Sequence, residues 1–353
     1  MGGELTYRGL ESADVPAVLE LLTASLAGGP TGRRSAEFFD WKHRENPFGS
    51  SPGLVAVAPD GRVVGVRLFL RWCWRGRDGS GEGGREVRAV RPVDTATHPD
   101  FQGRGIFRRL TTELLEQVCG DAELVFNTPN GNSLPGYLKM GWRELGRVPV
   151  ALRVARPVSF ARGARAALSR RPGPSGPPRC ELPSAADWLA DPGARRAGQL
   201  AELLAERERA DAADPRLHTV RTAPYLAWRY GAAPGLDYRV VSVERGGELV
   251  GLAFGRPRRR GPLAEFTLAE LIVRPGDRAA AAQLLRAAAS SGCDHAATHL
   301  APGTEAAAAG LRSGCVRAPR TGMVLAARTP TGPLPAERSL ADWRFSLGDL
   351  EVF

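Results

Sequence analysis

The chain has 353 residues, of which 43% are hydrophobic and 24% are charged, a composition typical of a soluble globular protein with room for two domains. No apolar run approaches the roughly 18 residues that cross a bilayer, no signal segment is present, and the five cysteines lack paired spacing, so we expect a cytoplasmic protein without a membrane partner. The formal net charge of +10 comes almost wholly from arginine that accompanies heavy alanine, glycine and proline usage throughout, and this spread disfavours a dedicated nucleic-acid site.

The first half of the chain alternates helical and extended patterns. A helix-like segment covers residues 14–26. Two apolar runs then flank the turn Asp60-Gly61, and this combination is a strong hairpin signal. Residues 87–99 form a further β-rich run, although Pro92 limits regular pairing there. A helix with apolar residues at helical spacing follows, and the order of these segments indicates an α/β unit.

The second half of the chain repeats this pattern. The stretches that start at Ser35 and Thr222 each run through an aromatic pair, a tryptophan (Trp41 and Trp228), a basic residue and a proline, and then into a hairpin. A helix-like segment precedes each stretch, at residues 195–210 in the second copy. So long a run of matched features indicates a duplicated α/β unit.

A segment rich in proline and glycine, residues 170–183, separates the two copies. Such a composition buries no core and is typical of an extended linker. We therefore divide the chain into a first unit, a linker, a second unit and a C-terminal tail, at residues 1–155, 156–184, 185–330 and 331–353.

The sequence Gln102-Gly-Arg-Gly105 stands between the β-rich run and the helix that follows it. Gly103 and Gly105 permit backbone conformations closed to larger residues and let a ligand approach the main chain. The helix begins with unpaired N–H groups and the positive end of its dipole, which suit a pyrophosphate. A tight strand–helix connection without a ligand would carry the same pattern, so the loop alone decides nothing.

Two sequence motifs, found in the right order, resemble those of a known family and favour a ligand-binding loop over a plain connection. Thr97-His98-Pro99 followed by Gln102-Gly-Arg-Gly105 resembles motif A of the GNAT acyltransferase superfamily. A second motif of that family is matched downstream at Asn130, Ser133, Tyr137, Gly141 and Trp142. The resemblance covers about residues 5–150. Residues 184–328 resemble the fold but lack the motifs, so we expect two tandem GNAT-like units, each a mixed twisted sheet flanked by helices, with the second unit degenerate.

The resemblance implies transfer of an acyl group from acetyl-CoA or another acyl-CoA to an amine. It assigns the binding of CoA to two strand residues, the glycine loop with the first helical turn, and two residues of the second motif: Thr95, Thr97, Gln102, Gly103, Arg104, Gly105, Ile106, Phe107, Asn130 and Ser133. Phe107 departs from the family's small residue at its position, and we interpret its side chain as pointing into the core.

The same resemblance places Tyr137 as the general acid that protonates the departing thiolate. A core tyrosine is the alternative. The general base is not evident in the sequence; Asp94 and His98, at the end of the β-rich run, are the candidates, and they would act through water.

The second copy replaces the glycine loop with Pro275-Gly276-Asp277, whose acidic side chain would repel phosphates. We therefore expect no acyl carrier in that unit. His295 and His299 are four apart, but their segment is typical of a buried strand and shows no third ligand, so no metal is expected.

The leading interpretation is an acyl-CoA-dependent N-acyltransferase that acts on a small-molecule amine. Two alternatives stay open. One is an aminoacyl-tRNA-dependent transferase that resembles the Fem-type enzymes, and the other is a non-catalytic, regulatory acyl-CoA-binding module. An acyl carrier protein could also take the place of CoA as the donor.

Overall fold

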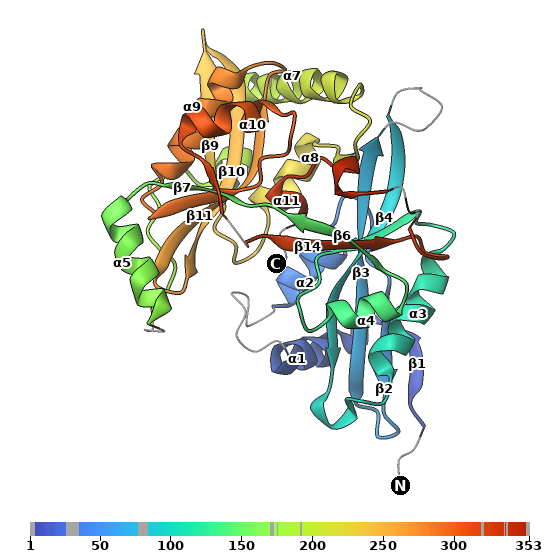
Figure 1. Ribbon diagram of the computed structural model, residues 1–353. Helices are drawn as coiled ribbons and strands as arrows, with labels where there is room; N and C mark the ends of the chain where they lie inside the picture. Colours follow the sequence, from blue (N-terminus) through green and yellow to red (C-terminus); the bar gives the residue numbers. More distant parts are fainter. Residues whose placement is uncertain are drawn as a thin grey trace.

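The protein is described from a computed structural model, which covers residues 4–25, 35–76, 84–169, 173–174, 176–190, 193–318, 321–334, 336 and 338–350. Two α/β units lie side by side, each built around its own mixed sheet with helices packed against it (Figure 1). The predicted fold class, two tandem α/β units, is confirmed.

The first sheet has the strand order β1-β2-β3-β4-β5-β14-β6, and β8 pairs with β3. Neighbouring strands are antiparallel except β4 and β5, which are parallel. Its strands are β1 (Thr6–Gly9), β2 (Gly53–Val57), β3 (Val63–Gly76), β4 (Arg85–Thr97), β5 (Leu124–Asn127), β6 (Arg143–Val148), β8 (His218–Thr219) and β14 (Met323–Arg328).

The second sheet has the order β13-β7-β12-β11-β10-β9 and contains one parallel pair, β11 with β12. Each sheet thus has a hairpin, a long strand and then a parallel neighbour reached through a helix. The strands are β7 (Ala151–Val154), β9 (Arg239–Arg245), β10 (Glu248–Arg260), β11 (Leu263–Val273), β12 (His295–Thr298) and β13 (Val316–Arg317).

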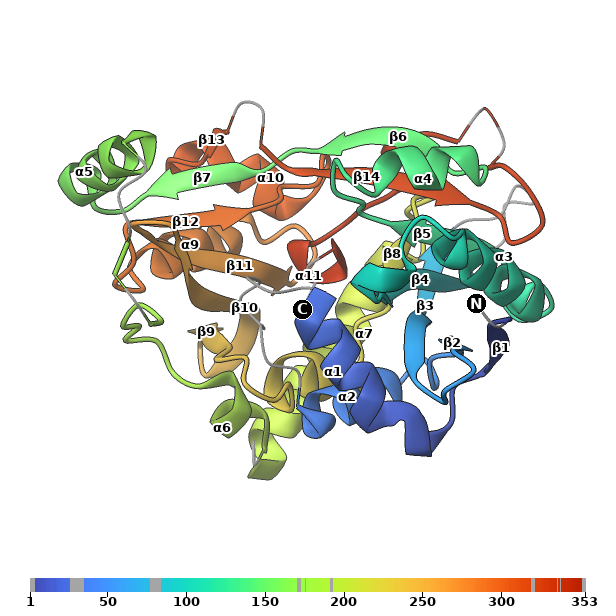
Figure 2. The same cartoon turned by 90° about the horizontal axis from the view of Figure 1, so that it is seen from below.

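The two sheets exchange strands. β7 follows β6 directly in the chain but pairs with β12 and β13 of the second sheet. β14, near the end of the chain, returns to lie between β5 and β6 of the first sheet. Figure 2 shows β6, β7 and β14 running along one side of both units. β7 lies within the predicted first unit and β14 within the predicted second unit, and each pairs with the sheet of the other unit. The boundaries at residues 155 and 330 stay predictions.

Helices cover both faces of the sheets. α3 and α4 pack on one face of the first sheet, and α1 and α2 pack on the other face together with α7, α8 and the C-terminal tail in a core shared by both units. Helices predicted at 14–26 and 195–210 are confirmed as α1 and α7. The α-helices are α1 (Val15–Ser25), α2 (Ala36–His43), α3 (Ile106–Val118), α4 (Leu134–Lys139), α5 (Pro157–Leu168), α6 (Ala185–Ala190), α7 (Gly193–Asp211), α8 (Ala223–Leu226), α9 (Arg278–Ala289), α10 (Glu305–Gly310) and α11 (Leu347–Leu350). Short turns of other helix types are η1 (Ser12–Asp14), η2 (Pro99–Phe101), η3 (Ala227–Gly231), η4 (Leu311–Ser313) and η5 (Leu340–Asp342).

The two copies of the repeated sequence contact each other through equivalent residues. Trp41 Nε1 donates to the carbonyl oxygen of Trp228 at 2.7 Å, and Trp228 Nε1 donates to the carbonyl oxygen of Trp41 at 2.8 Å. The two indole rings stack with their centroids 5.2 Å apart. Equivalent residues of the two copies therefore exchange equivalent hydrogen bonds, as expected of a duplicated unit packed about an approximate two-fold axis.

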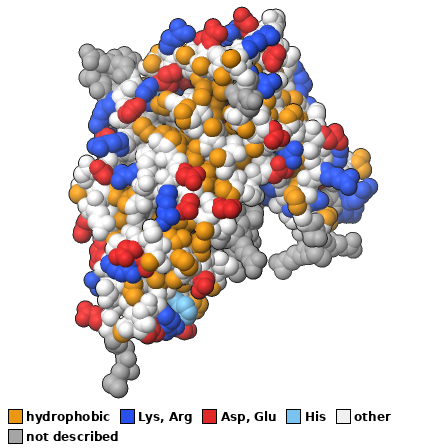
Figure 3. Space-filling view, turned by 180° about the vertical axis from the view of Figure 1, so that it is seen from behind, with side chains coloured by type: hydrophobic (Ala, Val, Ile, Leu, Met, Phe, Trp, Pro, Cys, Tyr) orange, Lys and Arg blue, Asp and Glu red, His pale blue; other side chains and the backbone are white. Residues whose placement is uncertain are grey.

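Charge on the surface is mixed. On the face shown in Figure 3, basic and acidic side chains are interspersed rather than gathered by sign. Within the described ranges, no helix has the length and apolarity required to cross a membrane.

Candidate active site

The two parallel strands of the first unit pair over a short stretch. β4 and β5 pair only at Ala89 with Leu124 and at Val90 with Val125. Pro92, just beyond the last pair, has no N–H to give to a neighbouring strand. The end of this pairing is the candidate cleft for a ligand.

A bulge in β4 follows the end of this pairing. The register of β3 against β4 shifts between Val66 and Leu68, so that Arg67 lies opposite two residues, Asp94 and Thr95. Asp94 has a φ of 43°, in the left-handed region that side-chain-bearing residues rarely adopt. Such bulges re-aim neighbouring groups and recur next to active sites.

The glycine loop follows the turn after β4 and leads into α3. Gly103 and Gly105 have φ values of 75° and 77°, and no heavy atom lies within 4 Å of the position that a Cβ would take at either residue. The first hydrogen bond of α3 runs from Arg109 N–H to Gly105 oxygen. The preceding N–H groups therefore have no partner within the helix and are available to an anion. This open, positively polarised loop fits a pyrophosphate.

The other predicted loop residues surround this turn. Gln102 Nε2 donates to Thr97 oxygen at 3.4 Å. Arg104 donates to Asp100 oxygen, and its guanidinium lies 4.8 Å from the Phe101 ring centroid. Ile106 is buried in the core beneath the loop. The loop thus holds its own shape and leaves its glycine backbone exposed.

The second motif forms the turn that starts α4. Asn130 Oδ1 accepts hydrogen bonds from the N–H groups of Asn132 and Ser133 and from the Ser133 hydroxyl, at 2.9–3.1 Å. Asn130 and Ser133 therefore fix the entry into α4, which is a structural role that does not exclude contact with CoA. Tyr137 lies on α4 and is 5% exposed.

Tyr137 reaches the bulge through an arginine that the sequence analysis did not single out. Arg67 Nη2 donates to the Tyr137 hydroxyl oxygen at 2.7 Å, and Arg67 Nη1 donates to Thr95 Oγ1. The Phe107 ring meets the Tyr137 ring edge-on at 5.7 Å. The interpretation of Phe107 as a core residue thus agrees with its contacts. The one signal for Arg67 in the sequence was its isolated charge within the apolar run 63–70.

The two candidate bases lie in different surroundings. Asp94 is buried, and its carboxylate lies 2.6 Å from Lys42 Nζ and 2.8 Å from His43 Nε2. Its Oδ2 is therefore already bound by two basic side chains. His98 caps the turn after β4, where its Nδ1 accepts from Asp100 N–H and its side chain is 34% exposed. The roles of both residues stay predictions.

The C-terminal tail packs between the units beside the candidate cleft. Arg91, on β4, donates to the carbonyl oxygens of Asp349 and Leu350 at 2.9 and 2.8 Å. Arg229, from the second unit, donates to Gly348 oxygen at 3.1 Å. Burial, together with the nearby Arg229 charge, lowers the pKa of Arg91 to about 10. Two buried cations thus hold the carbonyl end of α11, the negative pole of a helix.

In the second unit, side chains of the chain itself bind the loop before α9. The N–H of Gly276, in that loop, donates to Glu305 Oε1 at 2.9 Å, and Asp277 caps α9 through Ala280 N–H. Carboxylates of the chain therefore accept hydrogen bonds from this loop and from the first turn of α9. The absence of an acyl carrier in this unit stays a prediction.

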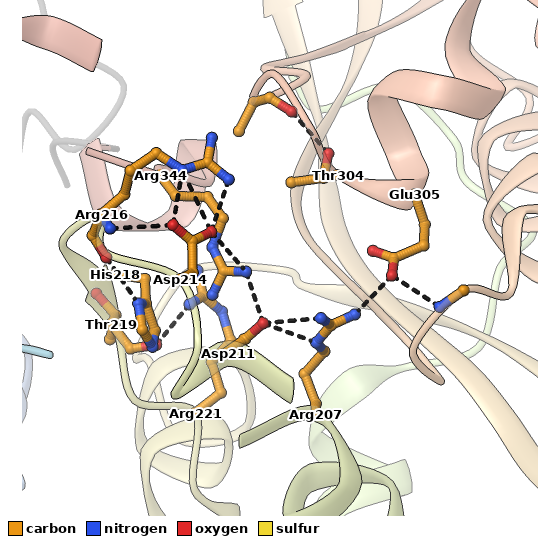
Figure 4. Close-up of polar contacts among 12 residues, drawn as sticks. Arg207, Asp211, Asp214, Arg216, His218, Thr219, Arg221, Thr304, Glu305 and Arg344 are labelled. Atoms are coloured by element: carbon orange, nitrogen blue, oxygen red, sulfur yellow. Dashed lines mark hydrogen bonds and ion pairs between the residues drawn. The ribbon is translucent and has the colours of Figure 1, made fainter. Parts of the chain in front are cut away.

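Ion pairs extend from this loop through a cavity of about 90 Å³ beside β11, β12 and α7. Arg207 contacts both Glu305 and Asp211, and Arg344 contacts Asp211 from the other side (Figure 4). Burial raises the pKa of Glu270, which also lines this cavity. The charges there neutralise one another, so the cavity offers no unmatched charge to a ligand.

The two histidines of β12 and its end have separate partners. His295 Nε2 lies 3.2 Å from Glu265 Oε2, and His299 Nδ1 lies 2.7 Å from Pro149 oxygen. In the part of the chain that the structure describes, no three His, Cys, Asp or Glu side chains group as metal ligands.

The comparison with protein families matches this site. A family model for the acetyltransferase (GNAT) domain matches residues 6–145, the range that holds the glycine loop and Tyr137. This match agrees with the two motifs and supports an N-acyltransferase enzyme. No curated protein matches the sequence.

Solved structures extend the likeness to the second unit. The chain is similar to a probable N-acyltransferase of unknown function from Enterococcus faecalis V583, at 12% identity and a TM-score of 0.58 over 93% of this chain and 73% of that chain. A GCN5-related N-acetyltransferase from Anabaena variabilis gives 12% and 0.59 over the same shares. Eis1 from Mycobacterium abscessus gives 15% and 0.52, over 91% and 73%. At these identities the likeness shows a shared fold.

Proposed function

We propose that the protein transfers an acyl group, in the simplest case acetyl, from acyl-CoA to the amine of a small molecule. The observation that carries this proposal is the glycine loop at the start of α3. Its two left-handed glycines leave space over the backbone, and it adjoins the candidate cleft where the pairing of β4 and β5 ends. Backbone N–H groups and the helix dipole would bind the pyrophosphate there, and Arg104 would add a positive charge.

Acyl-CoA supplies a thioester, whose carbonyl carbon accepts the amine nitrogen. As the C–N bond forms and the C–S bond breaks, the sulfur leaves with the electron pair and takes a proton. Tyr137 is the proposed donor of this proton, because its hydroxyl is held beside the bulge of β4 by Arg67. The amine loses one proton to a base, which we propose to be His98 acting through water, since Asp94 is committed to Lys42 and His43.

Release of free thiol from acetyl-CoA in the presence of a panel of small amines tests the proposal. Accumulation of free CoA that depends on an amine would support it. Transfer that occurs only with aminoacyl-tRNA would favour the Fem-like alternative, and CoA binding without turnover would favour a regulatory module. An acyl carrier protein offered in place of CoA would reveal the second possible donor.

Calorimetry with CoA tests the location of the site. Gly105→Glu should abolish binding, because its carboxylate would stand among the N–H groups meant for phosphate. Gly246→Glu is the matched control: Gly246 also has a left-handed φ, 61°, and open space around its Cβ position, but it lies in the hairpin turn of the second unit. Both variants carry the same backbone strain, of about 1–2 kcal/mol. Unchanged CoA affinity in the Gly105 variant would refute the placement.

A further inference from the structure

Arg67 is a buried cation without a counter-ion. Its side chain lies on β3 and is 0% exposed. Its donors reach two neutral oxygens, those of Tyr137 and Thr95, and its Nε, also buried, has no hydrogen-bond partner. Among the residues that the structure describes, no carboxylate pairs with Arg67. This sets it apart from the buried Lys42, whose Nζ contacts the Asp94 carboxylate.

Aromatic rings provide part of the compensation. The guanidinium carbon lies 5.3–5.4 Å from the ring centroids of Phe69, Phe107 and Tyr137. Cation–π contacts of this kind offset a fraction of the cost of burying a charge. A buried guanidinium that lacks a carboxylate remains strongly disfavoured unless an anion joins it. We therefore expect a negative charge to form near Arg67 during the reaction.

We propose that Arg67 is a positioning residue whose charge stabilises the CoA thiolate as it leaves, through the Tyr137 hydroxyl that it holds. This inference rests on the proposed function, since it requires CoA in the cleft. When the C–S bond breaks, the electron pair goes to sulfur, and the Tyr137 proton moves from oxygen to sulfur. The negative charge then lies on the Tyr137 oxygen, 2.7 Å from Arg67 Nη2, until the phenolate regains a proton from solvent. At either stage the anion faces the same guanidinium, so Arg67 neutralises charge that exists only during the reaction.

The same cation could instead recognise a carboxylate on the acyl group, such as that of succinyl-CoA. The geometry favours the thiolate, because two of the three nitrogens of the guanidinium point at the hydroxyls of Tyr137 and Thr95 rather than into open space. The choice of acyl donor in the experiment separates these two uses.

The test is an ultraviolet titration of the CoA thiol in complex with the full-length protein, in which absorbance reports the thiolate. In the wild-type complex the midpoint should lie below that of free CoA, with a thiolate fraction at fixed pH about tenfold higher or more. Arg67→Met should return the midpoint to that of free CoA or above it. Arg67→Lys, which keeps the charge but not the planar fork, should retain most of the shift.

Steady-state kinetics give the second readout. Arg67→Met should lower kcat with acetyl-CoA about as much as Tyr137→Phe does and leave KM for acetyl-CoA nearly unchanged. Arg229→Met is the matched control, because it removes another buried arginine that donates to a tyrosine hydroxyl, at 2.9 Å, in the second unit, and it should retain most of kcat. A loss confined to succinyl-CoA would overturn the proposal in favour of acyl recognition.

Three results separate the failure of this inference from that of the proposed function. Equal midpoints in the wild-type and Arg67→Met complexes, with CoA bound to both, would overturn the inference alone. If the Met variant does not fold, Tyr137→Phe gives the second arm: because the Arg67 charge acts through the Tyr137 hydroxyl, the midpoint should move toward that of free CoA, and a midpoint as low as in the wild-type complex would overturn the inference. Failure of the wild-type protein to bind CoA would overturn the proposed function and the inference together.

Discussion

Replacing Tyr137 by phenylalanine removes one oxygen and keeps the ring that packs against Phe107 and Trp142. As general acid, Tyr137 should contribute about 10²–10⁴-fold to turnover, which corresponds to about 3–5 kcal/mol of transition-state stabilisation. The KM for acyl-CoA should change little, because the hydroxyl acts on the leaving sulfur rather than in ground-state binding. Initial rates of thiol release with the true acceptor would measure both constants.

The structure adds a cost in stability to this substitution. Tyr137→Phe leaves an Arg67 donor without its acceptor, and loss of a buried hydrogen bond to a charged group costs about 1.5–3 kcal/mol. Tyr238→Phe is the matched control, because the Tyr238 hydroxyl accepts from buried Arg229 at 2.9 Å in the second unit. Both variants should lose similar stability in urea unfolding, and only Tyr137→Phe should lose rate. Equal loss of rate in the two variants, or full rate in Tyr137→Phe, would contradict the role of Tyr137.

Three further predictions concern the rest of the molecule. CoA titration should give one site per chain, since the Gly276 N–H is already bound by a carboxylate; two equivalent sites would refute this. Trp41→Phe and Trp228→Phe should be coupled by about 0.5–3 kcal/mol in a double-mutant cycle of unfolding, because each indole bonds the other's backbone; additive costs would show that the reciprocal contact contributes nothing. Burial and the Arg344 charge lower the pKa of His218 from its ordinary 6.5, so the unfolded chain takes up a proton that the folded chain refuses. Stability should therefore fall as the pH drops below about 6.5, by at most about 1.4 kcal/mol per pH unit for this residue, and His218→Gln should flatten the fall; an unchanged slope would contradict this.

Much of the fold follows from local signals in the sequence. The turn at Asp60-Gly61, the helical spacing after Gly105 and the repeated tryptophan segments each specify a structure over a few residues. The parallel pair of β4 and β5 follows from the helix that connects them. Pro92 predicts the end of this pairing, because it has no N–H to donate.

The exchange of strands could not be predicted in the same way. β7 and β14 are short apolar segments, and their local sequences do not specify the strands with which they pair. Their partners are fixed by the path of the whole chain, with β7 held to β12 and β14 inserted between β5 and β6. The anchoring of the tail by Arg91 likewise depends on a contact across more than 250 residues of sequence.

The site shows the same division between local and long-range information. The positions of Gly105 and Tyr137 follow from motifs, but a lone arginine in an apolar strand is equally compatible with a solvent-facing side chain. The direction of the Arg67 side chain follows from the alternation of side chains along β3. Gly65 and Phe69 lie two residues away on either side, and Gly65 packs against Ile106 of α3. Arg67 therefore faces the same helices rather than solvent, which agrees with its 0% exposure.

The two units differ in how the loop before the helix is bound. In the first, the loop has no side chain at the two left-handed positions, Gly103 and Gly105. In the second, Asp277 and Glu305 satisfy the equivalent groups, and the helix is capped from within the protein. Because internal carboxylates accept hydrogen bonds from these groups, the groups need no external ligand. The second unit also contacts the first directly: Trp228 and Arg229 bond the shared interface and the tail, and β7 pairs with the second sheet.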